Sequence, residues 1–199
     1  MIPSTGSMIG AVLAGGMSRR MGEDKAGLVL DSEPLWRRQV GVLAGAGLGR
    51  VVLVRRQDQD APPGVECWRD CIEGIGPLAG LHAALLPRAA DFVAVLAVDM
   101  PGIGPGWFEW LSGFCREGSG AMARHADVCE PLAAIYPAEA LAAVEAQIGA
   151  KYHSLQHLAL SLASVGRMTL LPLEGAEASR LGSVNTRSQF SAWELTRGR

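Results

Sequence analysis

A short apolar strand that leads directly into a glycine-rich, basic turn constrains this chain more than any other feature. Residues Met8–Leu13 read as a buried strand, and the chain then continues as LAGGMSRRMGEDK from Leu13 to Lys25. The adjacent Gly15 and Gly16 allow the backbone to turn sharply and to approach a ligand closely. Successive backbone N–H groups in such a turn form a concave anion site. Three cations follow in the same run: Arg19, Arg20 and Lys25. The run therefore predicts a site for the phosphates of a nucleotide.

Two better-known phosphate motifs do not match this run. The P-loop has four residues between its two glycines and continues with Lys-Ser or Lys-Thr. Here five residues separate Gly16 from Gly22, and Glu23 and Asp24 precede the lysine. The dinucleotide motif G-x-G-x-x-G is also absent. Two adjacent glycines alone would more often mark a solvated surface turn, but the complete run at the end of the first predicted strand favours a nucleotide site.

Strand-like and helix-like segments alternate through the first half of the chain. The predicted strands are 8–13, 51–55 and 92–98, and the predicted helices are 34–44 and 77–86. The strand 92–98 reads FVAVLAV, an unbroken apolar run that is typical of a sheet covered on both faces. The order strand, helix, strand, helix, strand predicts an α/β fold, with a doubly wound, mostly parallel sheet flanked by helices.

Asp99 directly follows the apolar strand 92–98 and precedes Met100 and Pro101. Ligands of doubly wound sheets bind outside the carboxyl ends of the strands. A carboxylate there is well placed to hold Mg²⁺ beside phosphates, because Mg²⁺ is commonly bound by one or two carboxylates and phosphate oxygens. The alternative is an exposed aspartate that begins a turn. The predicted nucleotide turn at the end of the first strand favours the metal role.

Charge and hydropathy limit the possible partners. The formal net charge is −2 and the sequence pI is about 6.1, whereas nucleic-acid binding usually needs a strongly basic face. No apolar run approaches the roughly 20 residues of a membrane span. Residues 1–7 lack the cationic start and apolar core of a signal peptide, so we expect a leader or a remnant of cloning there. We predict a cytoplasmic protein with neither nucleic-acid nor membrane partners.

The cysteines agree with a reducing compartment. Cys67 and Cys71 are four residues apart, which on a helix would place them on one face, but no second pair with zinc-ligand spacing follows. The other two cysteines are Cys115 and Cys129. We interpret all four as reduced structural thiols.

Several motifs in order resemble the molybdenum cofactor guanylyltransferases. The nucleotide run is followed by Pro34-Leu35, by Asp70, and by the segment GPLAG at 76–80. Later matches are Asp99-Met100-Pro101, Glu130-Pro131-Leu132 with Tyr136-Pro137, His153-Ser154-Leu155, and Val184-Asn185-Thr186. The resemblance spans residues 9 to 190 or so. The first and the Asp99 motifs are shared with related nucleotidyltransferases, whereas GPLAG and the ordered combination are more specific.

This resemblance implies a Rossmann-like nucleotidyltransferase that joins GMP from GTP to the phosphate of molybdopterin-bound molybdenum and releases pyrophosphate. The two substrates would be GTP and a molybdopterin-type cofactor, with Mg²⁺ as the metal. Cytidylyl-transferring relatives usually carry alanine in place of the first glycine of LAGG, so Gly15 favours GTP over CTP. We expect an added methyl there to hinder a purine that lies edge-on to the backbone.

The resemblance also implies roles for individual residues. Lys25 would hold the phosphates, Arg19 would orient the β- and γ-phosphates with Arg20 as a weaker candidate, and Asp99 would bind the metal. Asp70 would bind the nucleoside side of the substrate. The implied nucleotide-binding positions are Leu13, Ala14, Gly15, Gly16, Ser18, Lys25, Asp70, Gly76, Pro77, Leu78, Gly80 and Asp99.

The acceptor region departs from the family pattern at two places. A basic Lys-Arg-Ser-Leu run is common there, but this chain has His153 in place of the arginine. The closing turn usually reads Asn-x-Asn-Thr-Pro, but here Ser183 replaces the first asparagine and Arg187 replaces the proline. The acceptor-binding candidates are Lys151, His153 and Asn185, with Arg124 and Arg180 weaker.

We expect a single nucleotidyltransferase domain over residues 8–199, with a nucleotide-binding half at about 8–100 and an acceptor-binding half at about 101–195. Three alternatives remain open. The first is a related nucleotidyltransferase that uses CTP or another phosphorylated acceptor. The second is a non-catalytic nucleotide-binding relative, and the third is a structural partner in cofactor delivery to molybdoenzymes.

Overall fold

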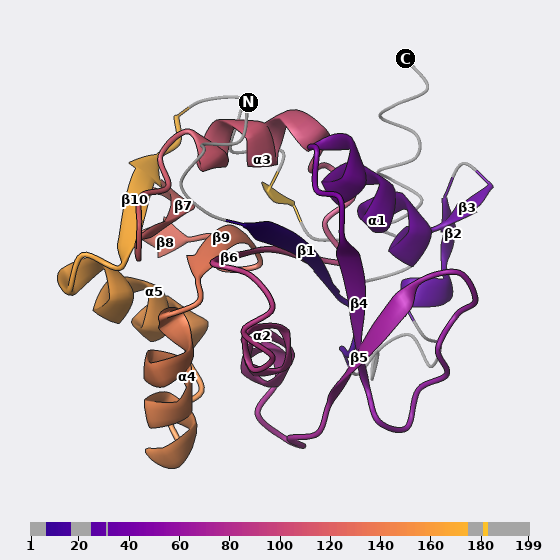
Figure 1. The fold of residues 1–199 in the computed structure, drawn as a ribbon, viewed down its shortest axis with the longest axis horizontal. Helices are drawn as coiled ribbons and strands as arrows, with labels where there is room; N and C mark the ends of the chain where they lie inside the picture. Colours follow the sequence, from indigo (N-terminus) through magenta and orange to yellow (C-terminus); the bar gives the residue numbers. More distant parts are fainter. Residues whose placement is uncertain (1–6, 17–24, 31, 175–180, 183–199) are drawn as a thin grey trace.

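A mixed sheet forms the centre of the molecule (Figure 1). The computed structural model describes residues 7–16, 25–30, 32–174 and 181–182. The sheet contains β1 (Met8–Leu13), β4 (Val51–Arg56), β5 (Glu66–Asp70), β6 (Phe92–Ala97), β7 (Gly120–His125), β8 (Val128–Cys129), β9 (Ala133–Pro137) and β10 (Met168–Pro172). A separate small hairpin pairs β2 (Val29–Leu30) with β3 (Glu33–Pro34), next to a 3₁₀ turn at Lys25–Gly27.

The strand order is β10-β7-β9-β6-β1-β4-β5, with β8 paired to β7. β1 runs parallel to β4 and β6, β4 to β5, and β7 to β10. β9 runs antiparallel to its neighbours β6 and β7. The predicted α/β architecture, a mostly parallel sheet flanked by helices, is confirmed.

Helices cover both faces of the sheet. α1 (Leu35–Gly45) and α3 (Pro105–Ser112) lie on one face, whereas α2 (Pro77–Leu85), α4 (Ala140–Gly149) and α5 (Leu155–Ser164) lie on the other (Figure 1). Because successive side chains of a strand point to opposite faces, Val12 of β1 packs in the α1–α3 layer, and Ala11 and Leu13 pack in the α2–α4–α5 layer. β1 and β6 are therefore buried on both sides, which explains their unbroken apolar sequences.

The elements predicted from the sequence are confirmed with small changes at their ends. The strand 8–13 has the predicted bounds, the strand 92–98 ends at Ala97, and the helices begin at Leu35 and Pro77. The late strand and the helix start implied by the family resemblance are present as β9 and α5. Cys67 and Cys71 do not share a helix, because Cys67 lies in β5 and Cys71 follows it. All four cysteines are free thiols.

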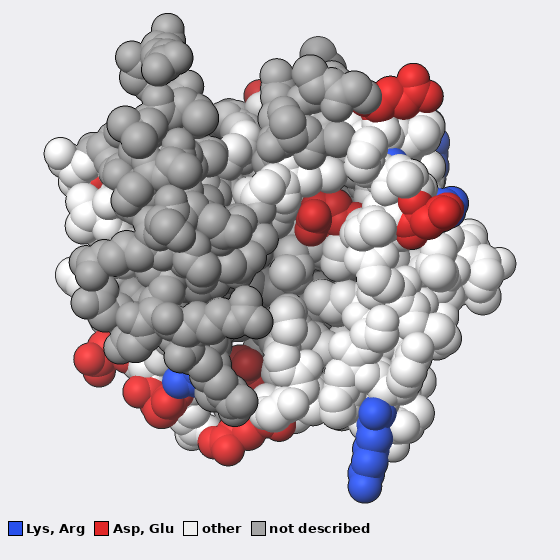
Figure 2. Space-filling model, turned by 180° about the vertical axis from the view of Figure 1, so that it is seen from behind, with Lys and Arg blue, Asp and Glu red and all other residues white. Residues whose placement is uncertain are grey.

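The described part of the chain contains no helix that is both long and apolar enough to cross a bilayer. On the face seen in Figure 2, the described surface is mostly uncharged, and its acidic and basic side chains are scattered.

Candidate active site

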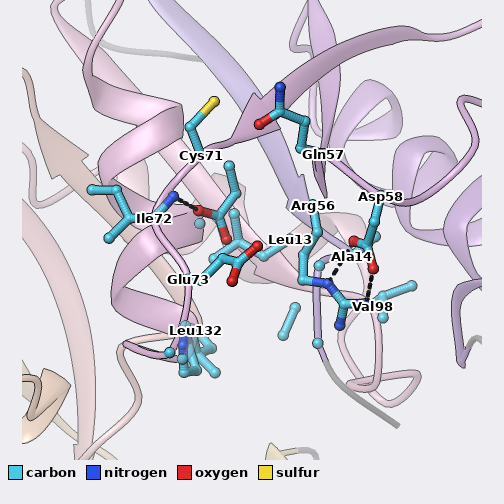
Figure 3. Close-up of a pocket in the computed structure, with 18 of the residues that line it drawn as sticks. Leu13, Ala14, Arg56, Gln57, Asp58, Cys71, Ile72, Glu73, Val98 and Leu132 are labelled. Atoms are coloured by element: carbon cyan, nitrogen blue, oxygen red, sulfur yellow. Dashed lines mark hydrogen bonds and ion pairs between the residues drawn. The ribbon is translucent and has the colours of Figure 1, made fainter.

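A cleft of about 880 Å³ opens at the carboxyl ends of β1, β4, β5 and β6. Each of these strands contributes the residues at its end or just after it, so segments far apart in the sequence meet at one edge of the sheet (Figure 3). The lining residues are Leu13 to Gly16, Arg56 to Asp58, Asp70 to Gly74, Gly76, Pro77, Gly80, Ala97 to Asp99 and Leu132. This is the edge at which doubly wound sheets bind their ligands.

The glycine turn at the end of β1 is held by hydrogen bonds to both neighbouring strands. The Ala14 N–H donates to the Val54 carbonyl at 2.8 Å, and the Val98 N–H donates to the Leu13 carbonyl at 3.1 Å. A Cβ added at Gly15 would lie 3.3 Å from Cγ of Arg56 and 3.4 Å from its backbone nitrogen. From the sequence, a methyl here is expected to hinder the purine; in the structure, the nearest described atoms that it would meet belong to Arg56.

The N-terminus of α2 supplies partial positive charge. Gly76 precedes the helix with φ of 65°, a left-handed conformation that favours glycine. Pro77 occupies the first helical turn, where its missing N–H removes no helical hydrogen bond. Both residues line the cleft, so the positive end of the helix dipole and its backbone N–H groups can interact with an anion there. Leu78 is completely buried in the core and is not among the described lining residues.

The end of β4 and the loop after it provide an ion pair that was not predicted from the sequence. Arg56 donates to the Asp58 carboxylate from Nε at 2.9 Å and from Nη2 at 2.8 Å (Figure 3). The hydrogen bond from Arg56 lowers the pKa of Asp58. Arg69 of β5 donates to the Arg56 carbonyl at 3.1 Å and thereby ties this loop to the neighbouring strand. The strand 51–55 was predicted, and residues after parallel strands share one edge, so this signal was present in the sequence.

Asp70 lies at the end of β5, in the cleft wall. Its carboxylate accepts from the Ile72 N–H at 3.0 Å. Burial raises the pKa of Asp70, and the Ile72 N–H and the positive charge of Arg56 oppose this effect. Glu73 also lines the cleft and was not predicted.

The residues around Asp99 fit a divalent cation. Asp99 lines the cleft just after β6. Glu130 precedes β9, which is antiparallel to β6, so its carboxyl group lies near Asp99. Burial, with a smaller contribution from the Asp99 charge, raises the pKa of Glu130 to about 7, and the Leu132 N–H opposes this. Carboxylate oxygens are hard donors that suit Mg²⁺, and Asp99, unlike Glu130, is among the described residues that line the cleft. No group of three or more His, Cys, Asp or Glu residues suited to a metal occurs among the described residues, so water and phosphate oxygens would complete the coordination.

Comparison with known proteins agrees with this geometry. Residues 10–164 match the model of the MobA-like NTP transferase domain. The chain belongs to the MobA-like NTP transferase family. It is therefore a nucleotidyltransferase.

Relatives of this MobA-like transferase carry a more specific name. A protein of Opitutus terrae named "Probable molybdenum cofactor guanylyltransferase" is 47% identical over 189 residues, which cover 93% of this chain and 94% of that protein. The "Molybdenum cofactor guanylyltransferase" of Syntrophotalea carbinolica is 36% identical over 156 residues, covering 77% and 74%. The crystal structure of molybdopterin-guanine dinucleotide biosynthesis protein A from Archaeoglobus fulgidus has the same fold, with a TM-score of 0.76 at 24% identity, covering 96% and 98%.

The cleft of this MobA-like transferase brings together most of the predicted nucleotide-binding positions: Leu13, Ala14, Gly15, Gly16, Asp70, Gly76, Pro77, Gly80 and Asp99. The backbone of Lys25 lies in the 3₁₀ turn before β2. Other predicted positions lie outside the described residues: Ser18, Arg19, Arg20, Arg180 and Asn185.

The acceptor candidates lie elsewhere. Lys151 follows α4 with φ of 55°, and His153 lies just before α5. Arg124 of β7 pairs with Asp127 at 2.7 Å. None of these three is among the described residues that line the cleft. The described wall of the cleft thus does not include the acceptor candidates.

Proposed function

We propose that this transferase moves GMP from GTP to the phosphate of a molybdopterin-type cofactor, forming the guanine dinucleotide cofactor and pyrophosphate. One observation supports this most strongly. The cleft combines a glycine turn, the positive end of α2 and the Asp99 carboxylate, in a chain 47% identical to a protein that carries the guanylyltransferase name.

The reaction needs positioning and charge neutralisation more than proton transfer. An acceptor phosphate oxygen attacks the α-phosphorus of GTP, the bond from that phosphorus to the bridging oxygen of the β-phosphate breaks, and pyrophosphate leaves. Because the attacking oxygen is already anionic, no residue has to act as a strong base. Lys25 and Arg19 would hold the phosphates, and the backbone around Gly15 and Gly16 would bind the nucleotide. Asn185 would help to fix the metal or the acceptor.

We assign Mg²⁺ to Asp99, with Glu130 near it. When bound, the cation supplies positive charge at the α-phosphate as transfer proceeds. Lys151 and His153 stay candidates for the acceptor phosphate.

We also propose that the enzyme works in the cytoplasm. Residues 8–100 would serve the nucleotide and residues 101–195 the acceptor, within one domain. Delivery proteins or molybdoenzymes would receive the product.

The test is turnover with the molybdenum-loaded pterin, offering GTP and CTP in parallel with Mg²⁺ and following dinucleotide formation. We expect preference for GTP, and we expect Asp99→Asn to lose Mg²⁺-dependent turnover while its unfolding temperature stays near that of the wild type. Preference for CTP would identify a cytidylyl relative. GTP binding without product would indicate another acceptor or a non-catalytic protein. Binding to a molybdoenzyme without either substrate would favour a structural role in delivery.

A further inference from the structure

One buried side chain, that of Gln39, forms hydrogen bonds with the turn that carries Asp99, from the interior of the protein. The Met100 N–H donates to the Ala97 carbonyl at 3.3 Å, which closes a four-residue turn with Asp99 in third place. Gln39 of α1 donates from Nε2 to the Met100 carbonyl at 2.8 Å and to the Ala97 carbonyl at 3.4 Å. A single amide group therefore binds the first and the last carbonyl of the turn.

Gln39 is itself held in place. Its exposed fraction is 0%, and its helix is anchored by the buried Leu35, Val42 and Leu43. This places the amide in the protein interior, behind the cleft wall formed by Ala97 to Asp99. Asp99 can thus keep one backbone position before any ligand binds.

Stability alone does not explain a glutamine at this position. Its Oε1 is buried and has no hydrogen-bond partner among the residues that the structure describes. A buried polar atom without a partner destabilises the folded state, and an apolar side chain of similar size would avoid that cost. Both carbonyls also accept a backbone N–H, that of Ala97 from Met100 and that of Met100 from Ile103, each at 3.3 Å, so the amide adds orientation more than stability.

We propose that Gln39 is a positioning residue that fixes the Asp99 turn for metal binding in the nucleotide complex. This inference rests on the proposed role of Asp99. Groups that orient a metal ligand without touching the metal typically change metal affinity or activity about 10- to 100-fold when they are removed.

The test measures Mn²⁺ binding to the full chain with GTP by electron paramagnetic resonance, without acceptor, together with kcat and KM and thermal unfolding. Gln39→Leu removes the amide and replaces it with an apolar side chain of similar size. Gln147→Leu is the matched control, because Gln147 is also a buried helical glutamine that donates to two carbonyls, those of Tyr152 and Ser154 at 3.1 and 3.2 Å. Those residues are not among the described lining residues.

We expect Gln39→Leu to weaken Mn²⁺ binding about tenfold and to lower kcat, with the unfolding temperature and the KM for GTP nearly unchanged. Gln147→Leu should bind Mn²⁺ like the wild type. Unchanged Mn²⁺ affinity in Gln39→Leu, or equal losses in both variants, would overturn the inference. If Gln39→Leu does not fold, Gln39→Met tests the same point with an unbranched chain. A wild type that does not bind Mn²⁺ with GTP would instead contradict the proposed function.

Discussion

At the scale of single residues, Gly15 sets how closely β1 and β4 approach at the cleft. A methyl at this position would meet Cγ of Arg56 at 3.3 Å and its backbone nitrogen at 3.4 Å. These distances are short enough to displace the arginine stem, and Arg56 carries the ion pair with Asp58. A side chain at position 15 would therefore change the position of Arg56 in the wall of the cleft.

Gly15→Ala should raise the KM for GTP by roughly tenfold, equivalent to about 1.4 kcal/mol. The cause is displacement of Arg56. Steady-state kinetics of Gly15→Ala, Arg56→Ala and the double variant form a double-mutant cycle. In the Arg56→Ala background the added methyl has more room, so its effect should be much smaller. An equal effect in both backgrounds would mean that the methyl acts on the nucleotide directly.

Glu130 should make stability depend on pH. Burial raises its pKa to about 7 from a usual 4.5, so between these values the folded protein holds a proton that the unfolded chain releases. The associated stability is fully present below about pH 4.5 and is lost as pH rises through 7. Glu130→Gln keeps a neutral side chain at every pH. Above pH 8 it should therefore be more stable than the wild type by about 2–3 kcal/mol.

Urea unfolding at pH 5 and pH 8, without metal or nucleotide, measures this effect. The difference between Glu130→Gln and the wild type should grow toward pH 8. The same difference at both pH values would show that Glu130 does not titrate in this range.

At the scale of elements, sequence prediction worked where a pattern has one physical meaning. The unbroken apolar run of β6 and the Pro-to-Gly bounds of α1 leave few alternatives, and both were predicted. β5 reads ECWRD and has no apolar alternation, because it is an edge strand whose Glu66 is ion-paired with Arg50, the residue just before the neighbouring strand β4. The antiparallel direction of β9 follows from tertiary pairing and has no local signal. The proximity of Glu130 and Asp99 depends on that direction, so it could not be predicted.

The start of α5 depends on a side-chain cap. Ser154 accepts from the His157 N–H through its Oγ at 3.2 Å, which satisfies one of the donors that a helix start leaves unpaired. Ser154→Ala should lower the free energy of unfolding by about 1 kcal/mol. Chemical denaturation checks this, with Ser164→Ala as the control. Ser164 donates only to the Ser161 carbonyl at the other end of the helix. Equal losses in the two variants would contradict a specific capping role.

At the scale of the whole molecule, Gly120 lies where the sheet depends on close packing between two strands. It is the first residue of β7 and packs against β9, which connects β7 and β10 to the rest of the sheet. A Cβ there would overlap the Ile135 carbonyl oxygen and lie 2.9 Å from Cδ of Pro137. Because both neighbours belong to β9, the contact can be relieved only by separating the strands. Gly120→Ala should therefore destabilise the protein by more than about 3 kcal/mol.

Thermal unfolding of Gly120→Ala beside Gly41→Ala tests this prediction. Gly41 lies on the exposed side of α1 with no atom within 4 Å of an added Cβ. An alanine there should leave stability unchanged or raise it by up to about 1 kcal/mol. A folded, stable Gly120→Ala protein would mean that β7 and β9 do not pack this closely.

The antiparallel strand β9 also affects how the chain folds while it is being synthesised. All six residues of β6 are buried in the finished sheet, where β6 lies between β1 and β9. During translation β1 is available first, but the other edge of β6 has no strand until Ala133–Pro137 have left the ribosome. A nascent chain of intermediate length therefore presents an unpaired apolar edge, the kind of surface that chaperones cover and that otherwise aggregates. For the same reason, a fragment that stops at residue 100 would associate with itself before it could bind a nucleotide.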